Sequence, residues 1–188
     1  MQTLTNLGSI YTTGPLLVLL GLWLCMQNLK QVAFGYAAIV ISVCALALAI
    51  KYMLYDPLNP EWDHQHAIVS QYFPSGHVLV SVLTYGAYAI VASLLGGISR
   101  AITGSIAGSA VLIVGYSRIA LVAHPWGDVA GGLFLGLMAL WLLVALIQRY
   151  ALQKRSTGSL LIWGIGVWGI AFATVRLFEP VIPFVPGG

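Results

Sequence analysis

Charged side chains are scarce in this sequence, where they make up only 7% of 188 residues. Soluble domains carry roughly 25% charged residues. Hydrophobic residues make up 60% of the chain, and apolar runs of about 20 residues are long enough to span a bilayer as helices. The shortage of charge therefore excludes a soluble globular protein and predicts an integral membrane protein. The net charge of +3 does not indicate nucleic-acid binding, because the eight lysines and arginines are scattered along the chain.

Cysteine is also rare. The two cysteines, Cys25 and Cys44, each lie inside an apolar run, which favours buried reduced thiols over a disulfide or a metal site. We predict neither a metal nor a cofactor for this chain. The first four residues include no lysine or arginine, so we expect no cleaved signal peptide.

The apolar runs predict an all-α fold, a polytopic membrane helix bundle of about six transmembrane helices. They leave no room for a soluble domain, so we expect residues 1–188 to form a single integral membrane domain. The longest break, about residues 56–76, contains prolines and acids at a density that no spanning helix tolerates, which predicts a surface loop. The six runs cover residues 10–27, 33–54, 77–96, 101–122, 126–148 and 159–178.

Charge also predicts an orientation. The connections after the first, third and fifth runs contain basic residues and no acid, whereas the connections on the other face contain all five acids. Since short cytoplasmic connections are enriched in Lys and Arg, we expect the acidic face and both termini to be extracytoplasmic, in a prokaryotic inner membrane. The basic residues are Lys30, Arg100, Arg149, Lys154 and Arg155, and the acids are Asp56, Glu61, Asp63, Asp128 and Glu179.

Two pairs of glycines recur at helical spacing, Gly104 with Gly108 and Gly132 with Gly136. Small residues four positions apart let helix backbones approach closely. We interpret both pairs as packing within one chain, with a dimer face as the alternative. The sequence does not predict the oligomeric state.

A first polar cluster, Pro74-Ser75-Gly76-His77, opens the third apolar run. The free N–H groups and the positive dipole end of a helix start form an anion site. Gly76 would let the backbone approach an anion, Ser75 adds a hydroxyl donor, and His77 could reach the anion as an acid. Taken alone, a Pro-Ser-Gly sequence is also typical of ordinary helix capping.

A second polar cluster reads Ser117-Arg118, five residues, His124, three residues, Asp128. Arg118 suits bidentate phosphate recognition, although a lone arginine at a helix end also snorkels to the interface. Pro125 suits a first helical position, and four residues separate His124 from Asp128, which places them on one side of a helix. A carboxylate at the imidazole Nδ1–H fixes the tautomer and leaves Nε2 free to attack. We interpret the two clusters as halves of one phosphate site.

These two clusters resemble the second and third signature motifs of the type 2 phosphatidic acid phosphatase superfamily, which includes the vanadium haloperoxidases. Every fixed position of both motifs is present, in the right order. The first motif of that family is Lys, six residues, then Arg-Pro. Lys51 stands at its lysine, but Leu58 and Asn59 stand at its Arg-Pro. Arg176 could supply the missing charge, or it could pair with Glu179 at the interface.

The resemblance implies metal-independent hydrolysis of a phosphate monoester or diphosphate on a membrane lipid, at the extracytoplasmic helix ends. The implied substrates are polyprenyl diphosphate, phosphatidylglycerol phosphate or phosphatidic acid. It further implies that His124 attacks phosphorus to form a phosphohistidine, that His77 protonates the leaving oxygen and then activates water, and that Asp128 orients His124. The residues that would hold the phosphoryl oxygens are Lys51, Ser75, Gly76 and Arg118.

Two other functions remain open at this stage. The same residues would serve a phosphotransferase that passes the phosphoryl group to a second lipid or a sugar. A non-enzymatic lipid-binding protein is suggested only by the departure in the first motif, and the presence of both histidines and Asp128 argues against it. We interpret His64 and His66 as part of a loop that frames the site, with a metal site as the weaker alternative.

Overall fold

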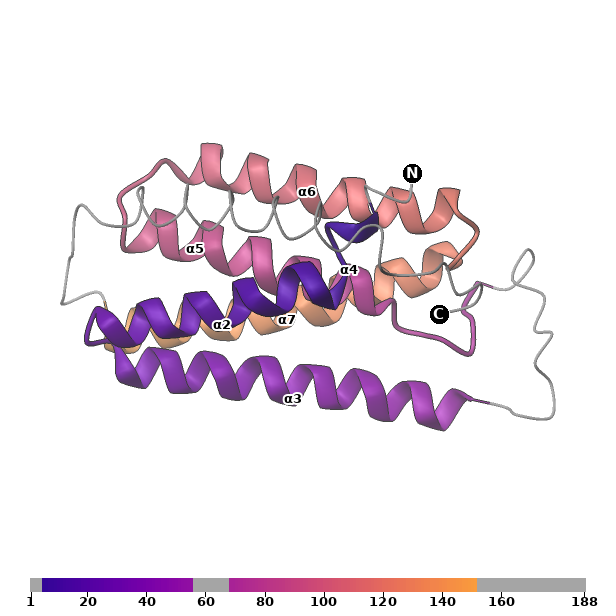
Figure 1. Ribbon diagram of the computed structural model, residues 1–188, viewed down its shortest axis with the longest axis horizontal. Helices are drawn as coiled ribbons and strands as arrows, with labels where there is room; N and C mark the ends of the chain where they lie inside the picture. Colours follow the sequence, from indigo (N-terminus) through magenta and orange to yellow (C-terminus); the bar gives the residue numbers. More distant parts are fainter. Residues whose placement is uncertain (1–4, 56–67, 152–188) are drawn as a thin grey trace.

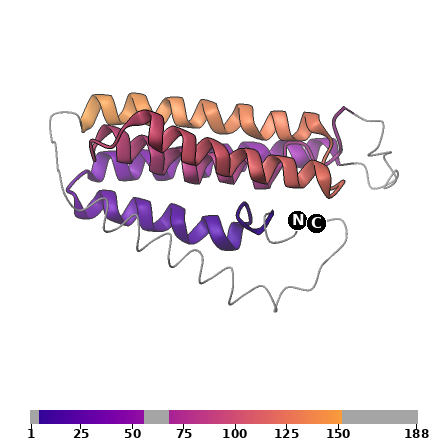
Figure 2. The same cartoon turned by 90° about the horizontal axis from the view of Figure 1, so that it is seen from above.

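The computed structural model describes residues 5–55 and 68–151, and within these ranges every regular element is a helix (Figure 1). Figures 1 and 2 show the long helices lying side by side along one direction. Short connections reverse the chain between α2 and α3, between α5 and α6, and between α6 and α7. The elements are α2 (Ile10–Met26), α3 (Lys30–Leu54), α4 (Gly76–Ser81), the π-helix η1 (Val82–Gly86), α5 (Ala87–Leu94), α6 (Arg100–Ala120) and α7 (Trp126–Tyr150).

These helices confirm an all-helical membrane protein over the described residues. Four segments are long and apolar enough to cross a membrane: α3, the continuous α4–η1–α5 segment, α6 and α7. The helix α2 is apolar but shorter, with 17 residues. The first five predicted runs therefore correspond to helices, and the chain is an integral membrane protein. The sixth predicted run, residues 159–178, lies outside the described residues.

The α4–η1–α5 segment lies at the centre of the bundle. Of an apolar 18-residue stretch of this segment, 50% is buried inside the protein. In corresponding stretches of α3, α6 and α7 the buried share is only 17–28%. Leu79 of α4 and Leu83 of η1 are almost fully buried, in one core cluster with Leu24 of α2 and Leu143 of α7. The surrounding helices expose large apolar side chains such as Phe134, which suits contact with lipid tails.

Glycines allow α7 to pack closely against the central segment. A Cβ atom at Gly132 would lie 2.6 Å from the carbonyl oxygen of Ser75, and one at Gly136 would lie 2.6 Å from Cβ of Val82. This pair therefore packs within the chain, as predicted. At Gly104 and its neighbour four residues on, no described atom lies within 4 Å of such a Cβ, so within the described residues that pair makes no comparable contact.

Gly132→Ala should separate α7 from the start of α4, because the added methyl group meets backbone that cannot rotate away. Overpacking of this kind typically costs about 1–3 kcal/mol. We expect a lower midpoint of thermal unfolding in detergent and, since Asp128 lies one turn earlier on α7, a loss of activity. Gly104→Ala is the matched control, and an equal change in both variants would contradict the packing described here.

Candidate active site

Backbone hydrogen bonds tie together the two polar clusters, although more than 40 residues separate Ser75 from His124 in the sequence. The amide of Ser75 donates to the carbonyl oxygen of Asp128 at 2.9 Å, and the amide of Gly127 donates to the carbonyl oxygen of Ile68 at 3.1 Å. The segment before α4 therefore lies against the first turn of α7. A side chain at Gly127 would overlap the Ile68 backbone, so glycine is required for this approach.

The end of α6 places His124 over the start of α7. Val122 has a φ of 54°, a left-handed conformation that β-branched residues rarely adopt. With this turn, the amides of Ala123 and His124 approach the carbonyl oxygen of Arg118 at 3.0 Å and 3.4 Å, as in a helix C-cap. The helix α7 begins at Trp126, so the proline before it occupies the N-cap position and not the first helical position that the sequence predicts.

His124 and Asp128 form a buried hydrogen-bonded pair. Their side chains are 7% and 0% exposed, and Nδ1 of His124 lies 2.8 Å from Oδ2 of Asp128. Since the carboxylate can only accept, Nδ1 carries the proton and Nε2 keeps its lone pair. The pair that the four-residue spacing predicts is therefore present, in the geometry that leaves a free imidazole nitrogen.

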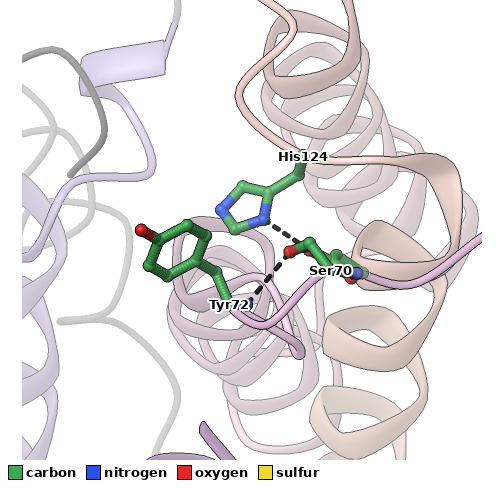
Figure 3. Close-up of polar contacts among 4 residues, drawn as sticks. Ser70, Tyr72 and His124 are labelled. Atoms are coloured by element: carbon green, nitrogen blue, oxygen red, sulfur yellow. Dashed lines mark hydrogen bonds and ion pairs between the residues drawn. The ribbon is translucent and has the colours of Figure 1, made fainter. Parts of the chain in front are cut away.

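The carboxylate of Asp128 has a second partner that the sequence analysis missed. The amide of Ser70 donates to Oδ1 at 2.9 Å, and the hydroxyl of Ser70 donates to Oδ2. Figure 3 shows Ser70 beside His124. No spacing rule identifies a serine four residues before Pro74 as a partner of a carboxylate 58 residues away, and burial of its side chain is visible only in the structure.

Cationic side chains surround the two histidines. Arg118 is only 6% exposed, and Nζ of Lys51 lies 4.0 Å from the position that a Cβ atom of Gly76 would take. The charges of Lys51 and Arg118 act on both His77 and His124. Lys51 from the end of α3, His77 from α4 and Arg118 from α6 therefore meet at the same end of the bundle.

Two buried donors at this site have no hydrogen-bond partner among the described residues, namely the hydroxyl of Ser75 and Nε of Arg118. Buried polar groups are nearly always satisfied, and an unmade hydrogen bond to a charged group costs more than one to a neutral group. A hydroxyl and a guanidinium nitrogen that lack acceptors, near the charge of Lys51, suit an anion with several acceptor oxygens, such as a phosphoryl group.

The segment before α2 also contacts Arg118. Thr5 Oγ1 accepts from Ser117 Oγ at 3.1 Å and from Nη1 of Arg118 at 3.4 Å. The carbonyl oxygen of Leu7 accepts from the hydroxyl of Tyr85 at 2.7 Å, which anchors this segment to η1. Thr5 could not be identified from the sequence, because a threonine near the start of a chain has no distinguishing pattern.

Burial lowers the pKa of His124 below its usual value of 6.5. The hydrogen bond and the charge of Asp128 act in the opposite direction, and the charges of Arg118 and Lys51 add to the lowering. The neutral imidazole, with Nε2 unprotonated, is therefore the dominant form at neutral pH. This is the form that a nucleophilic histidine requires.

A family model described as the PAP2 superfamily matches residues 32–152. The chain belongs to the PAP2 superfamily. The match covers nearly all of α3, all of α4 through α7 and both polar clusters, whereas Thr5 lies before it. No curated protein and no solved structure matches the chain.

Several residues named in the sequence analysis lie outside the described residues. They are Leu58 and Asn59, which stand at the Arg-Pro of the first motif, and His64, His66 and Arg176. Lys51, the lysine of that motif, is described and faces the start of α4.

Thr5→Val should weaken anion binding, because Arg118 loses the hydroxyl oxygen that holds one of its nitrogens. A hydrogen bond to a charged group is worth about 1.5–3 kcal/mol. Because this bond is long, at 3.4 Å, the dissociation constant of inorganic phosphate should rise by about tenfold at most. Thr5→Ser keeps the hydroxyl and is the matched control. Titration of the purified protein with phosphate measures both, and equal affinities would show that Thr5 does not position Arg118.

Proposed function

We propose that this PAP2 protein hydrolyses a phosphate monoester or diphosphate on a membrane lipid through a phosphohistidine intermediate. The observation that carries the proposal is the buried His124–Asp128 pair, which leaves Nε2 free. At the same end of the bundle, Ser75 Oγ and Arg118 Nε are buried donors without a hydrogen-bond partner among the described residues. A nucleophile and open phosphate-binding groups at the ends of apolar helices are what a lipid phosphatase needs. No metal is assigned a role in this mechanism.

In the first step, Nε2 of His124 forms a bond to phosphorus while the bond from phosphorus to the leaving oxygen breaks. His77, in the first turn of α4, gives its proton to that oxygen. Asp128 accepts the Nδ1–H throughout and stabilises the positive charge that develops on the ring. In the second step, water attacks phosphorus and gives a proton to His77, the N–P bond breaks, and inorganic phosphate leaves.

The phosphoryl oxygens would be bound by the side chains of Lys51, Ser75 and Arg118 and by the backbone at Gly76. Their fixed charges and dipoles match what phosphoryl transfer requires, which is mainly positioning and stabilisation of the charge that spreads over the oxygens. The start of α4 adds free N–H groups and the positive end of a helix dipole.

The substrates that fit this site carry their phosphate at the membrane surface. The site lies at the ends of α3, α4, α6 and α7, so a phosphate on a lipid headgroup could reach it while the acyl or prenyl chains stay in the bilayer. Polyprenyl diphosphate, phosphatidylglycerol phosphate and phosphatidic acid share this chemistry.

The proposed orientation places the site outside the cytoplasm. Lys30, Arg100 and Arg149 lie at the opposite end of the bundle from Asp128, and basic residues are enriched on the cytoplasmic side. The lipid would therefore be hydrolysed in the outer leaflet of a prokaryotic inner membrane.

The purified protein should release inorganic phosphate from one or more of these lipids, and release should persist when a chelator is present. His124→Ala should abolish release while the protein stays folded, because the nucleophile is lost. The fastest lipid in the panel identifies the substrate class. If the phosphoryl group appears on a second lipid instead of in solution, the protein is a transferase, and normal release by His124→Ala would refute the phosphohistidine.

Cysteine labelling tests the orientation. In a background in which Cys25 and Cys44 are serine, Ile68→Cys at the site end should react with a membrane-impermeant maleimide added to intact cells, and Ser99→Cys should react only after lysis. Both positions are exposed, so access depends on the side of the membrane. The reverse pattern would place the site in the cytoplasm.

A further inference from the structure

We propose that Ser70 is a positioning residue that holds the Asp128 carboxylate in place for His124. The inference rests on the proposed function, in which His124 is the nucleophile. It assigns to the segment before α4 a direct part in setting up that nucleophile, in addition to its part in binding phosphate.

Ser70 donates hydrogen bonds to both oxygens of the Asp128 carboxylate. Its amide donates to Oδ1 at 2.9 Å and its hydroxyl donates to Oδ2. Asp128 is 0% exposed and Ser70 is 1% exposed, so water does not compete for these bonds. Two donors on two oxygens prevent the carboxylate from rotating, which fixes the direction in which Oδ2 meets the imidazole.

The direction of the hydroxyl proton follows from a third contact. The amide of Tyr72 donates to Ser70 Oγ at 3.0 Å (Figure 3). The hydroxyl oxygen therefore acts as an acceptor toward Tyr72, and its single proton is directed to Oδ2 of Asp128, which can only accept. The chain of donors runs from the Tyr72 amide through Ser70 and ends at Asp128.

Oδ2 of Asp128 thus accepts two hydrogen bonds, one from the Ser70 hydroxyl and one from Nδ1–H of His124. Each donor withdraws negative charge from the carboxylate and so lowers its attraction for the imidazolium. The charges that act on His124 come from three helices: Asp128 from α7, Arg118 from α6 and Lys51 from α3. His77 of α4 is the other titratable group near it, and the charge of His124 acts on His77.

The contribution of the Ser70 side chain can be separated from that of the segment that carries it. Two backbone bonds, Ser75 to Asp128 and Gly127 to Ile68, hold this segment against α7 without any help from the Ser70 hydroxyl. Ser70→Ala therefore removes one donor from the carboxylate and leaves the segment attached.

The test combines Ser70→Ala, Asp128→Asn and the double variant, with Ser93→Ala as the control. Ser93 donates to the carbonyl oxygen of Ile90 within α5, so its loss removes a serine hydroxyl away from the site. Removing the partner that orients a metal-bound imidazole costs about 10- to 100-fold in affinity or activity, and we expect a similar fall in kcat for Ser70→Ala with little change in KM. In the Asp128→Asn background the same substitution should change kcat less than about twofold, because coupled residues are not additive.

A second measurement does not depend on turnover. The chain has four histidines, so histidine-labelled protein in detergent gives a simple NMR spectrum, and His124→Gln identifies the resonance of His124. In Ser70→Ala the carboxylate keeps more negative charge and stabilises the imidazolium. His124 should therefore titrate at a higher pH than in the unaltered protein, and the acid limb of kcat/KM should move in the same direction.

Ser70→Ala with normal kcat and an unshifted His124 titration would overturn the proposal, as would equal losses in the presence and absence of the Asp128 carboxylate. If Ser70→Ala does not fold, Ser70→Cys keeps a weak donor of similar size and should give intermediate shifts. If the unaltered protein releases no phosphate from any lipid, the proposed function fails, while the NMR titration still decides the role of Ser70.

Discussion

A buried carboxylate is the constraint on which the rest of this site depends. Asp128 has no exposed surface, and a charge removed from water in this way costs several kcal/mol unless it is fully hydrogen-bonded. The donors come from the segment before α4 and from the connection between α6 and α7. The hydrogen bonds to Asp128 thus hold together α7, the segment before α4 and the connection between α6 and α7. The same bonds orient the imidazole that performs the proposed reaction.

The close packing of α7 and the donors without hydrogen-bond partners both affect the polar groups of the site. The glycines of α7 let the helix approach the central segment until backbone meets backbone, which removes the space where water would solvate the polar groups. In this region the hydroxyl of Ser75 and Nε of Arg118 have no hydrogen-bond partner among the described residues. In the proposed reaction, a phosphoryl group with its several acceptor oxygens would accept from these donors.

Much of this arrangement could be predicted from the sequence. Apolar length predicted five of the helices, and the four-residue spacing of His124 and Asp128 predicted their contact, because both are properties of one continuous stretch of chain. Ser70 and Thr5 could not be predicted, since serines and threonines are common in connections and each finds its partner through the fold. The π-helix η1 also has no simple signature, since its residues are as apolar as those of the α-helices on either side. The predicted start of the fifth run, residue 126, is the start of α7, whereas Pro125 is the N-cap and not the first helical residue.

The contacts of the site span long stretches of chain, 112 residues between Thr5 and Ser117 and 58 between Ser70 and Asp128. Contacts between distant residues form late in folding, because the intervening chain must first be ordered. A growing chain that has inserted only its early helices therefore has Lys51 and His77 but lacks Arg118 and His124. In the proposed mechanism these four residues act together, so the site would be complete only after α7 has entered the membrane, and an incompletely synthesised protein would not carry out the proposed reaction.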